Sequence, residues 1–292
     1  MMIEDKPRIR FGPSGNSDSF YAQGYTATSQ APAWIKEMGL TAFEYSFGHG
    51  IRIKDETAGA IAEQAKQYDI QMSVHLPYYV NLTVSEPEKQ QKNRDYFMQA
   101  VSAGSKMGAI RGVFHPGSAG KGNRLEPLAA ACNLLRLIMR DLDAAGYWAF
   151  TLCPETMGKF SQLGDLEEVL TICGIDERLI PCIDFGHLHC RGQGALKSKE
   201  DFAEILDAIE DRLGMQRARS IHIHFSRIEY TASGEKMHHT FADTQYGPEF
   251  PPLAELLAER KYSPVVICES RGTMAEDAIA MQKMYEMAVG RG

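Results

Sequence analysis

Seven side chains that can bind a metal ion stand at comparable places along this chain, each at or just after a short apolar run. They are His75, His115, Glu155, Asp184, His187, His222 and Glu269. Imidazoles and carboxylates together suit zinc or manganese. One such residue is more often a buried hydrogen-bonded side chain than a ligand. Seven of them favour a metal centre, because buried charge is costly unless it is paired or bound to an ion.

The stretch from Cys182 to His187 shows this pattern in its most compact form. The apolar run 179–183 predicts a buried strand, and Asp184 follows it directly. Gly186 permits a turn that brings His187 back toward the same space. Taken alone, this pair fits a buried Asp–His hydrogen bond as well as it fits a metal site.

Eight apolar runs predict strands, and a helical pattern follows each of them. We expect the strands at residues 9–12, 42–47, 72–76, 112–114, 149–153, 179–183, 220–225 and 265–268. Eight strand–helix units at roughly 30-residue spacing fit an α/β fold, the (β/α)8 TIM barrel, as a single domain over residues 1–292. A doubly wound open sheet is the alternative, but residues 12–15 do not match the glycine-rich turn that it needs.

In a barrel the carboxyl ends of the strands meet on one face, so we expect the metal site there. Two ions about 3.5–4 Å apart suit phosphodiester hydrolysis, because they lower the pKa of a bound water and neutralise the phosphate. The same ligands could instead hold one ion that polarises a sugar during isomerisation. A protein that binds metal without catalysing a reaction is a third possibility. We expect His224 to face the helix layer, because its strand is ending there.

Composition limits the partners and the compartment. The net charge of -7 predicts no general affinity for nucleic acid, although a local basic rim would suffice. Six cysteines without a C-x-x-C pair indicate reduced thiols and a cytoplasmic protein. The charged segment 1–6 is no signal peptide, and no apolar run is long enough for a membrane span.

Several segments resemble the endonuclease IV family of apurinic/apyrimidinic endonucleases (family 2), in the xylose-isomerase-like TIM barrel superfamily. They are HLPYYVNL at 75–82, FHPGS at 114–118, Glu155-Thr156, CID at 182–184 with His187, IHI at 221–223, His238-His239 and Glu269. The FHPGS segment and the CID segment with its histidine are the most specific. Their order along the chain makes accidental agreement improbable.

The resemblance implies a zinc-dependent hydrolase of DNA repair that binds DNA containing abasic sites. Such an endonuclease, a deoxyribonuclease IV, cleaves the phosphodiester 5′ to the abasic site with a zinc-bound hydroxide. The implied ligands are His75 and His115 for one zinc, Glu155 as a bridge, Asp184, His222 and Glu269 for a second, and His187 and His238 for a third. We expect Glu155 and Glu269 to act in catalysis. We expect the site to hold two or three zinc ions, or manganese, and the protein to be a monomer.

Some positions depart from the family. Lys236 stands where the family has an aspartate ligand of the third zinc, and a cation there would repel a metal. Glu235, one residue earlier, is an alternative ligand. We predict that Lys236 binds substrate, together with Tyr78 and Asn81. The loops that contact DNA in the family also differ, so a sugar isomerase or epimerase with one or two divalent ions remains the alternative.

Overall fold

Eight parallel strands form the centre of the protein. The structure is a computed structural model and describes residues 8–48, 50–120 and 122–290. The strands are β1 (Arg10–Pro13), β2 (Ala42–Ser46), β3 (Gln71–His75), β4 (Ala109–Phe114), β5 (Thr151–Pro154), β6 (Cys182–Asp184), β7 (His222–Phe225) and β10 (Val265–Cys268). They pair as two four-stranded sheets, in the orders β1-β10-β7-β6 and β2-β3-β4-β5.

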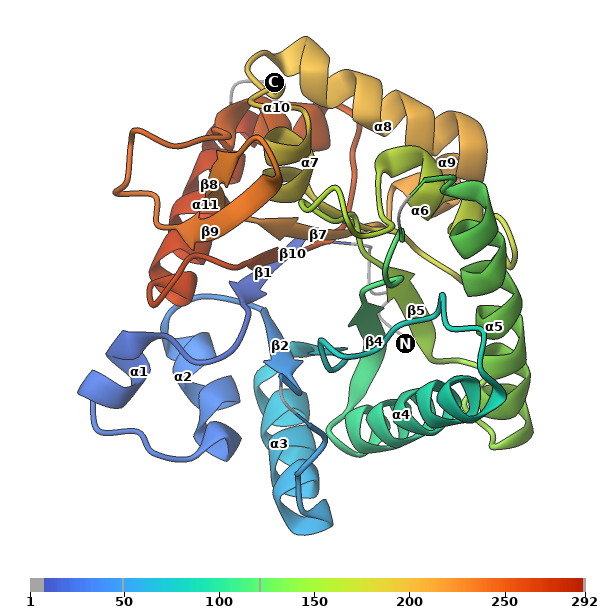
Figure 1. Cartoon of the computed structure of the whole chain (residues 1–292). Helices are drawn as coiled ribbons and strands as arrows, with labels where there is room; N and C mark the ends of the chain where they lie inside the picture. The colour runs from blue at the N-terminus through green and yellow to red at the C-terminus, as the bar shows by residue number, and fades with distance from the viewer. Residues whose placement is uncertain (1–7, 49, 121, 291–292) are drawn as a thin grey trace.

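The two sheets meet at both edges, which closes the ring of strands. Parallel bridges join Ser14 to Glu44 at one seam and Glu155 to Cys182 at the other. A Cβ on Gly12 would lie 1.8 Å from the carbonyl oxygen of Ala42, so the first seam requires glycine. The predicted α/β barrel is confirmed (Figure 1).

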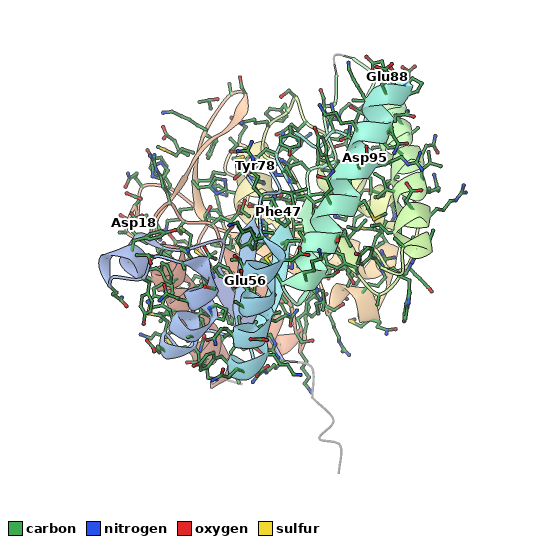
Figure 2. All side chains as sticks on the ribbon, turned by 90° about the horizontal axis from the view of Figure 1, so that it is seen from below. Asp18, Phe47, Glu56, Tyr78, Glu88 and Asp95 are labelled. Carbon is green, nitrogen blue, oxygen red and sulfur yellow. The ribbon has the colours of Figure 1, made fainter. Side chains whose placement is uncertain are left out.

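Helices surround the strands and cover their outward side chains. The larger ones are α2 (Ala31–Glu37), α3 (Asp55–Tyr68), α4 (Pro87–Lys106), α5 (Leu125–Ala144), α6 (Leu166–Cys173), α8 (Lys199–Leu213), α10 (Pro251–Glu259) and α11 (Met274–Val289). The main apolar core lies between strands and helices, with Phe97 and Phe202 almost fully buried. Glu56 of α3 and Glu88 and Asp95 of α4 project from the outer surface (Figure 2). Among the described residues, no helix is long and apolar enough to cross a membrane.

Six elements of the described residues were not expected from the sequence. They are α1 (Asp18–Ala22), a 3-10 turn (Thr28–Gln30), α7 (Phe185–Arg191), α9 (Met215–Ala218) and the antiparallel hairpin of β8 (Arg227–Thr231) and β9 (Gly234–His239). Helix α7 begins immediately after β6, and the hairpin follows β7. Both elements contribute side chains to the site described below.

The barrel interior is more polar than the layer outside it. Successive strand residues alternate between the two sides, and two small apolar clusters fill part of the inside. These clusters are Ala42, Val265 and Ile267, and Val113, Cys153 and Cys182. Buried polar side chains take other inward positions: Glu44, Ser73, Arg111, His222 and His224. Since buried polar groups need partners, these side chains must pair with one another or with a bound ion.

Candidate metal centre

A cavity of about 620 Å³ opens at the carboxyl ends of the strands. Most of the residues predicted for the site line it: His75, Tyr78, His115, Glu155, His187, Lys236, His238 and Glu269. They come from the ends of β3, β4, β5 and β10, from α7 and from the β8–β9 hairpin. Residues distant in sequence therefore converge on one space, as expected for a barrel.

The first ligand group consists of His75, His115 and Glu155, whose donor atoms all lie within 4.8 Å of one another. The Nε2 atoms of His75 and His115 lie 3.2 Å and 3.1 Å from the same carboxylate oxygen, Oε2 of Glu155. Each residue stands at the end of a neighbouring strand or directly after it. This is the trio that the resemblance implies for one zinc.

The second ligand group consists of Glu155, Asp184, His224 and Glu269. Nδ1 of His224 lies 3.1 Å from Oε1 of Glu155 and 3.4 Å from Oε1 of Glu269. Asp184 caps helix α7 through Oδ1, which accepts the backbone N–H of His187. Its other oxygen, Oδ2, is buried without a hydrogen-bond partner among the described residues. An ion at this place would satisfy it.

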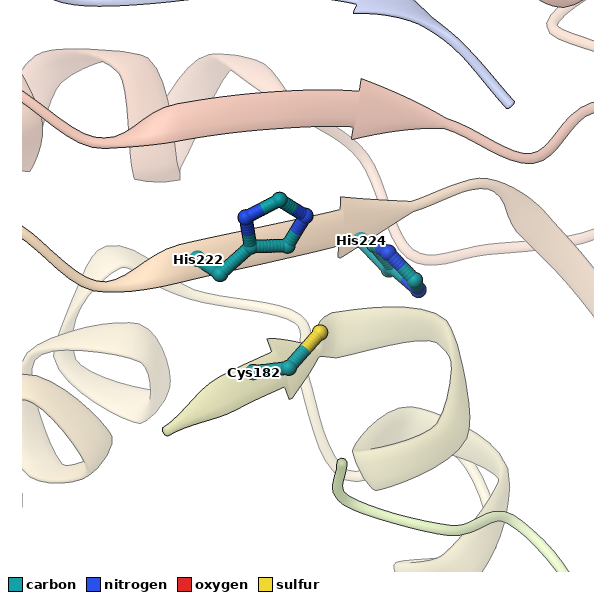
Figure 3. A group of neighbouring side chains, drawn as sticks. All are labelled: Cys182, His222 and His224. Atoms are coloured by element: carbon teal, nitrogen blue, oxygen red, sulfur yellow. The ribbon is translucent and has the colours of Figure 1, made fainter. Parts of the chain in front are cut away.

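His224, and not the predicted His222, belongs to this second group. His222 pairs in register with Cys182, whereas His224 pairs with Asp184 at the end of β6. His222 therefore lies one layer deeper, where its Nε2 is 3.0 Å from Oε2 of Glu44. The expectation that His224 faces the helices is wrong, because β7 stays regular to Phe225 and both imidazoles contact Glu44 inside the barrel. Figure 3 shows the two side chains on β7 near Cys182 of β6.

The third ligand group consists of His187, Glu235 and His238. Nε2 of His187 lies 3.5 Å from Oε2 of Glu235, and Nε2 of His238 lies 3.9 Å from Oε1 of the same carboxylate. Lys236 lines the cavity, but its amine pairs with Glu229 at 2.5 Å. Glu235 therefore stands beside the two histidines in the manner of a third ligand.

An irregularity in the hairpin explains why Glu235 replaces the residue at position 236. Tyr230 pairs with Glu235 and Glu229 pairs with Met237, so Lys236 is an extra residue in β9. Residues three apart normally face opposite sides of a strand, and one extra residue restores them to the same side. Glu235 and His238 therefore both reach His187.

Hydrogen bonds fix the orientation of the histidines. The ring nitrogen Nδ1 of His75 lies 2.8 Å from the carbonyl oxygen of Leu76, and Nδ1 of His187 lies 2.8 Å from that of Thr156. A carbonyl can only accept, so each Nδ1 bears the proton when the ring is neutral. Nε2 is then free to bind a metal in the cavity, the arrangement usual for metal-binding histidines.

The electrostatics of the cavity favour positive charge among its carboxylates. Burial would raise the pKa of Glu155, but His224, His115 and His75 outweigh it and hold this pKa well below its ordinary value. For an imidazole the sign is opposite: burial would lower the pKa of His75, but Glu155 outweighs burial and raises this pKa to about 9. Protonated imidazoles thus balance the carboxylates, and a bound cation would displace these protons.

The predicted substrate-binding residues differ in their placement. Tyr78 is 55% exposed, and its ring centroid lies 6.0 Å from those of His75 and His115. Asn81 is not among the described residues that line the cavity. Its Oδ1 accepts hydrogen bonds from the backbone N–H groups of Thr83 and Ser118. It therefore joins two loops beside the site, and its contact with substrate stays a prediction.

Sequence reasoning missed two residues that the structure places at the centre. His224 was assigned to the wrong side of its strand, although alternation puts it with His222. Glu44 is absent from the predicted set. Its signal was a carboxylate inside the apolar strand of residues 42–47, where a charge needs a partner.

Comparison with known proteins agrees with the barrel fold. Residues 32–285 match the family model described as "Xylose isomerase-like TIM barrel". The chain belongs to this family. An uncharacterized protein of Methanocaldococcus jannaschii is 30% identical over 251 residues, which cover 86% of this chain and 89% of that protein. A probable endonuclease 4 of Acholeplasma laidlawii is 30% identical over 190 residues, covering 63% of this chain and 62% of that relative.

Solved structures of other proteins share the fold. Endonuclease IV from Thermus thermophilus has a TM-score of 0.67 and 20% identity, over 91% of this chain and 95% of that one. A D-tagatose 3-epimerase-like protein has a TM-score of 0.68 and 19% identity, over 86% of this chain and 90% of that one. Similarities this distant establish the TIM barrel but do not separate a nuclease from an epimerase.

Proposed function

We propose that this chain is a metal-dependent phosphodiester hydrolase that cleaves DNA 5′ to abasic sites. The observation on which the proposal depends is that three ligand groups meet in one cavity, and the first two share Glu155. The similarity to a probable endonuclease 4 supports the choice of substrate.

The residues present fit two or three divalent ions. Nitrogen and oxygen donors, without an exposed thiolate, suit zinc or manganese. The first ion would be held by His75, His115 and Glu155, the second by Glu155, Asp184, His224 and Glu269, and the third by His187, Glu235 and His238. Such ions would supply a water that ionises near neutral pH and positive charge for the phosphate.

Glu155 and Glu269 are the proposed catalytic residues. Glu155 directs Oε2 toward His75 and His115 and Oε1 toward His224, so one carboxylate faces both ligand groups. The side chain of Glu269 is 17% exposed and lines the cavity, whereas that of Glu155 is 1% exposed. Glu269 is therefore the carboxylate of the pair more accessible to a substrate.

The mouth of the cavity carries basic side chains that could bind a nucleic acid, although the net charge of the whole chain is negative. Lys159, Lys236 and Arg271 line it and would lie close to phosphates. The exposed ring of Tyr78 offers a surface for a sugar or a base. We propose that Lys236 and Tyr78 contact the DNA.

A sugar isomerase or epimerase is the second candidate. The specific observation in its favour is the second group, where Glu155 and Glu269 face one possible ion together with Asp184 and His224. Two glutamates beside one ion could remove and return a proton on a sugar carbon. The first and third groups favour the hydrolase, because an epimerase with one ion needs none of those additional imidazoles.

The deciding experiment measures incision of a duplex oligonucleotide that contains one abasic site, with an intact duplex as the control substrate. Protein with a counted number of metal ions should cleave 5′ to the abasic site only. His115→Ala should lose metal and activity, since His115 belongs to the first group. If fully loaded protein leaves the abasic strand intact and epimerises a ketose, the hydrolase proposal is wrong.

A matched pair of variants tests the third group. His238→Ala should slow incision, whereas the neighbouring His239→Ala should not. His239 pairs with Glu229 and stacks on Tyr246, outside the three groups. Equal effects of the two substitutions would remove His238 from the site.

A further inference from the structure

The orientation of His224 differs from that of the other histidines in the cavity. His75 and His187 place Nδ1 2.8 Å from a backbone carbonyl oxygen and turn Nε2 toward a carboxylate of the cavity. Nδ1 of His187 also lies 3.3 Å from Oδ2 of Asp184. His224 is reversed, because its Nδ1 faces Glu155 and Glu269. Its Nε2 points down the barrel, away from these carboxylates, and needs a different partner.

That partner is Glu44 of β2. Nε2 of His224 lies 2.9 Å from Oε1 of Glu44, and both side chains are completely buried. Neither atom has a hydrogen-bond partner within the parts of the chain that the structure describes. A proton on Nε2 would satisfy both atoms at once after a small rotation of either side chain.

The carboxylate of Glu44 is itself held in place. Ser73 Oγ donates a hydrogen bond to its Oε2 at 2.8 Å, and Nε2 of His222 lies 3.0 Å from the same oxygen. The backbone of Glu44 is fixed by the bridge to Ser14 at the barrel seam. Oε2 of Glu44 is thus held by Ser73 and His222, and Oε1 remains directed at His224.

We propose that Glu44 is a positioning residue for the metal centre. It accepts the Nε2–H of His224, so that Nδ1 is presented as a metal ligand, and it makes the imidazole a better donor. A carboxylate behind a metal-binding histidine has this effect in other proteins, and its loss typically weakens metal binding 10- to 100-fold. The inference rests on the proposed metal centre, but it does not depend on DNA as the substrate.

A different occupant of the same space would contradict the proposal. Cys182, His222 and His224 place donor atoms within 4.8 Å of one another (Figure 3). Nδ1 of His222 has no hydrogen-bond partner among the described residues. If an ion bound there, His224 would serve a deeper site, and Glu44 would be a ligand or a counter-charge.

Metal binding to four purified variants distinguishes these accounts. Bound zinc is counted, and its affinity is measured by competition with a chelator in protein shown to be folded by circular dichroism. Glu44→Ala should bind one ion about 10- to 100-fold more weakly. Glu44→Gln, which has the same shape and can still accept a hydrogen bond, should show a smaller loss, and it replaces the alanine variant if that one does not fold.

Two substitutions serve as controls in the same buried region. Ser73→Ala removes one hydrogen bond to Glu44 but leaves His222 beside the same oxygen, so zinc affinity should stay within a few-fold of the wild type. Cys182→Ala should retain every ion and the full affinity. Substitution of cobalt gives an independent readout, since Glu44→Ala should alter the visible spectrum of one bound ion.

The proposal is overturned by either of two results. One is unchanged zinc affinity and cobalt spectrum in both Glu44 variants. The other is loss of an ion from Cys182→Ala, which would indicate the deeper site. Neither readout uses DNA, so absence of incision would reject the proposed substrate and leave this inference standing.

Discussion

Replacing each of the two histidines of β7 by alanine in turn provides the most direct test of the second ligand group. His224→Ala removes a donor that lies 3.1 Å from Glu155 and 3.4 Å from Glu269. His222→Ala removes an imidazole of the same strand that also contacts Glu44 but does not belong to the second group. Both side chains are fully buried, so the two variants lose similar packing and differ mainly in the proposed ligand.

The expected magnitude follows from the number of ligands. Zinc binding to structural sites contributes about 10–16 kcal/mol, usually through four ligands, or about 3 kcal/mol for each. Since about 1.4 kcal/mol corresponds to a factor of ten, His224→Ala should bind the second ion about 100-fold more weakly. His222→Ala should cost about 1.5–3 kcal/mol of folding free energy, because the buried carboxylate of Glu44 loses its hydrogen bond with His222.

The assay is metal content after dialysis against increasing concentrations of chelator, together with thermal unfolding of the same samples. His224→Ala should lose an ion at chelator concentrations that leave His222→Ala fully loaded. The opposite order would refute the reasoning. It would show that His222 is the ligand and that the register between β6 and β7 does not govern the site.

Three further outcomes are expected. Glu235→Ala should lower the bound metal by one ion per chain, whereas Lys236→Asp should leave the count unchanged; a gain of metal in the second variant would show that position 236 is the natural ligand position. Gly12→Ala should sharply reduce the folded yield or the melting temperature, because a Cβ there would collide with Ala42 at the barrel seam. Gly59→Ala should stabilise the protein by about 0.5–1 kcal/mol, because Gly59 lies in α3 with open space around it. Equal melting temperatures of the two variants would contradict this prediction. Glu168→Gln should lower stability at pH 7 by about 2 kcal/mol, and a pH-independent difference from the wild type would refute it.

The sign of the Glu168 prediction follows from its partners. Burial raises the pKa of this carboxyl, but Arg124 and the backbone N–H groups of Gly164 and Asp165 outweigh it and hold the pKa below 4.5. A carboxyl with a lowered folded-state pKa stabilises the protein fully above its unfolded pKa, and this stabilisation is lost as the pH falls through the folded value. The stability difference between the wild type and Glu168→Gln should therefore begin to shrink as the pH falls below about 4.5 and vanish below the folded-state pKa.

The position of the site could be predicted because strand ends are visible in the sequence. Apolar runs mark the strands, and a parallel barrel brings their carboxyl ends together whatever the loops do. This is why His75, His115, Glu155 and Glu269 were expected in one cavity, and the structure places them there. No knowledge of side-chain conformation was needed.

The errors arose where a shift of one or two residues decides which side chain enters the cavity. The strand that contains both histidines ends at Phe225 as expected, but its register with β6 places His224, and not His222, at the level of Asp184. In β9 an extra residue turns Glu235 inward beside His238. Register and bulges depend on pairing with another strand, and a single sequence contains little information about that pairing.

The buried charge of the barrel indicates which part of the site the fold itself supports. Glu44, His222 and His224 lie on strands, below the cavity, and are completely buried. The third group depends instead on α7 and on the β8–β9 hairpin, which stand outside the eight-stranded ring. The second ion should therefore be the most tightly held and the third the first to leave under chelation. If the third ion persists after the second has gone, the barrel interior is not what organises the metal centre.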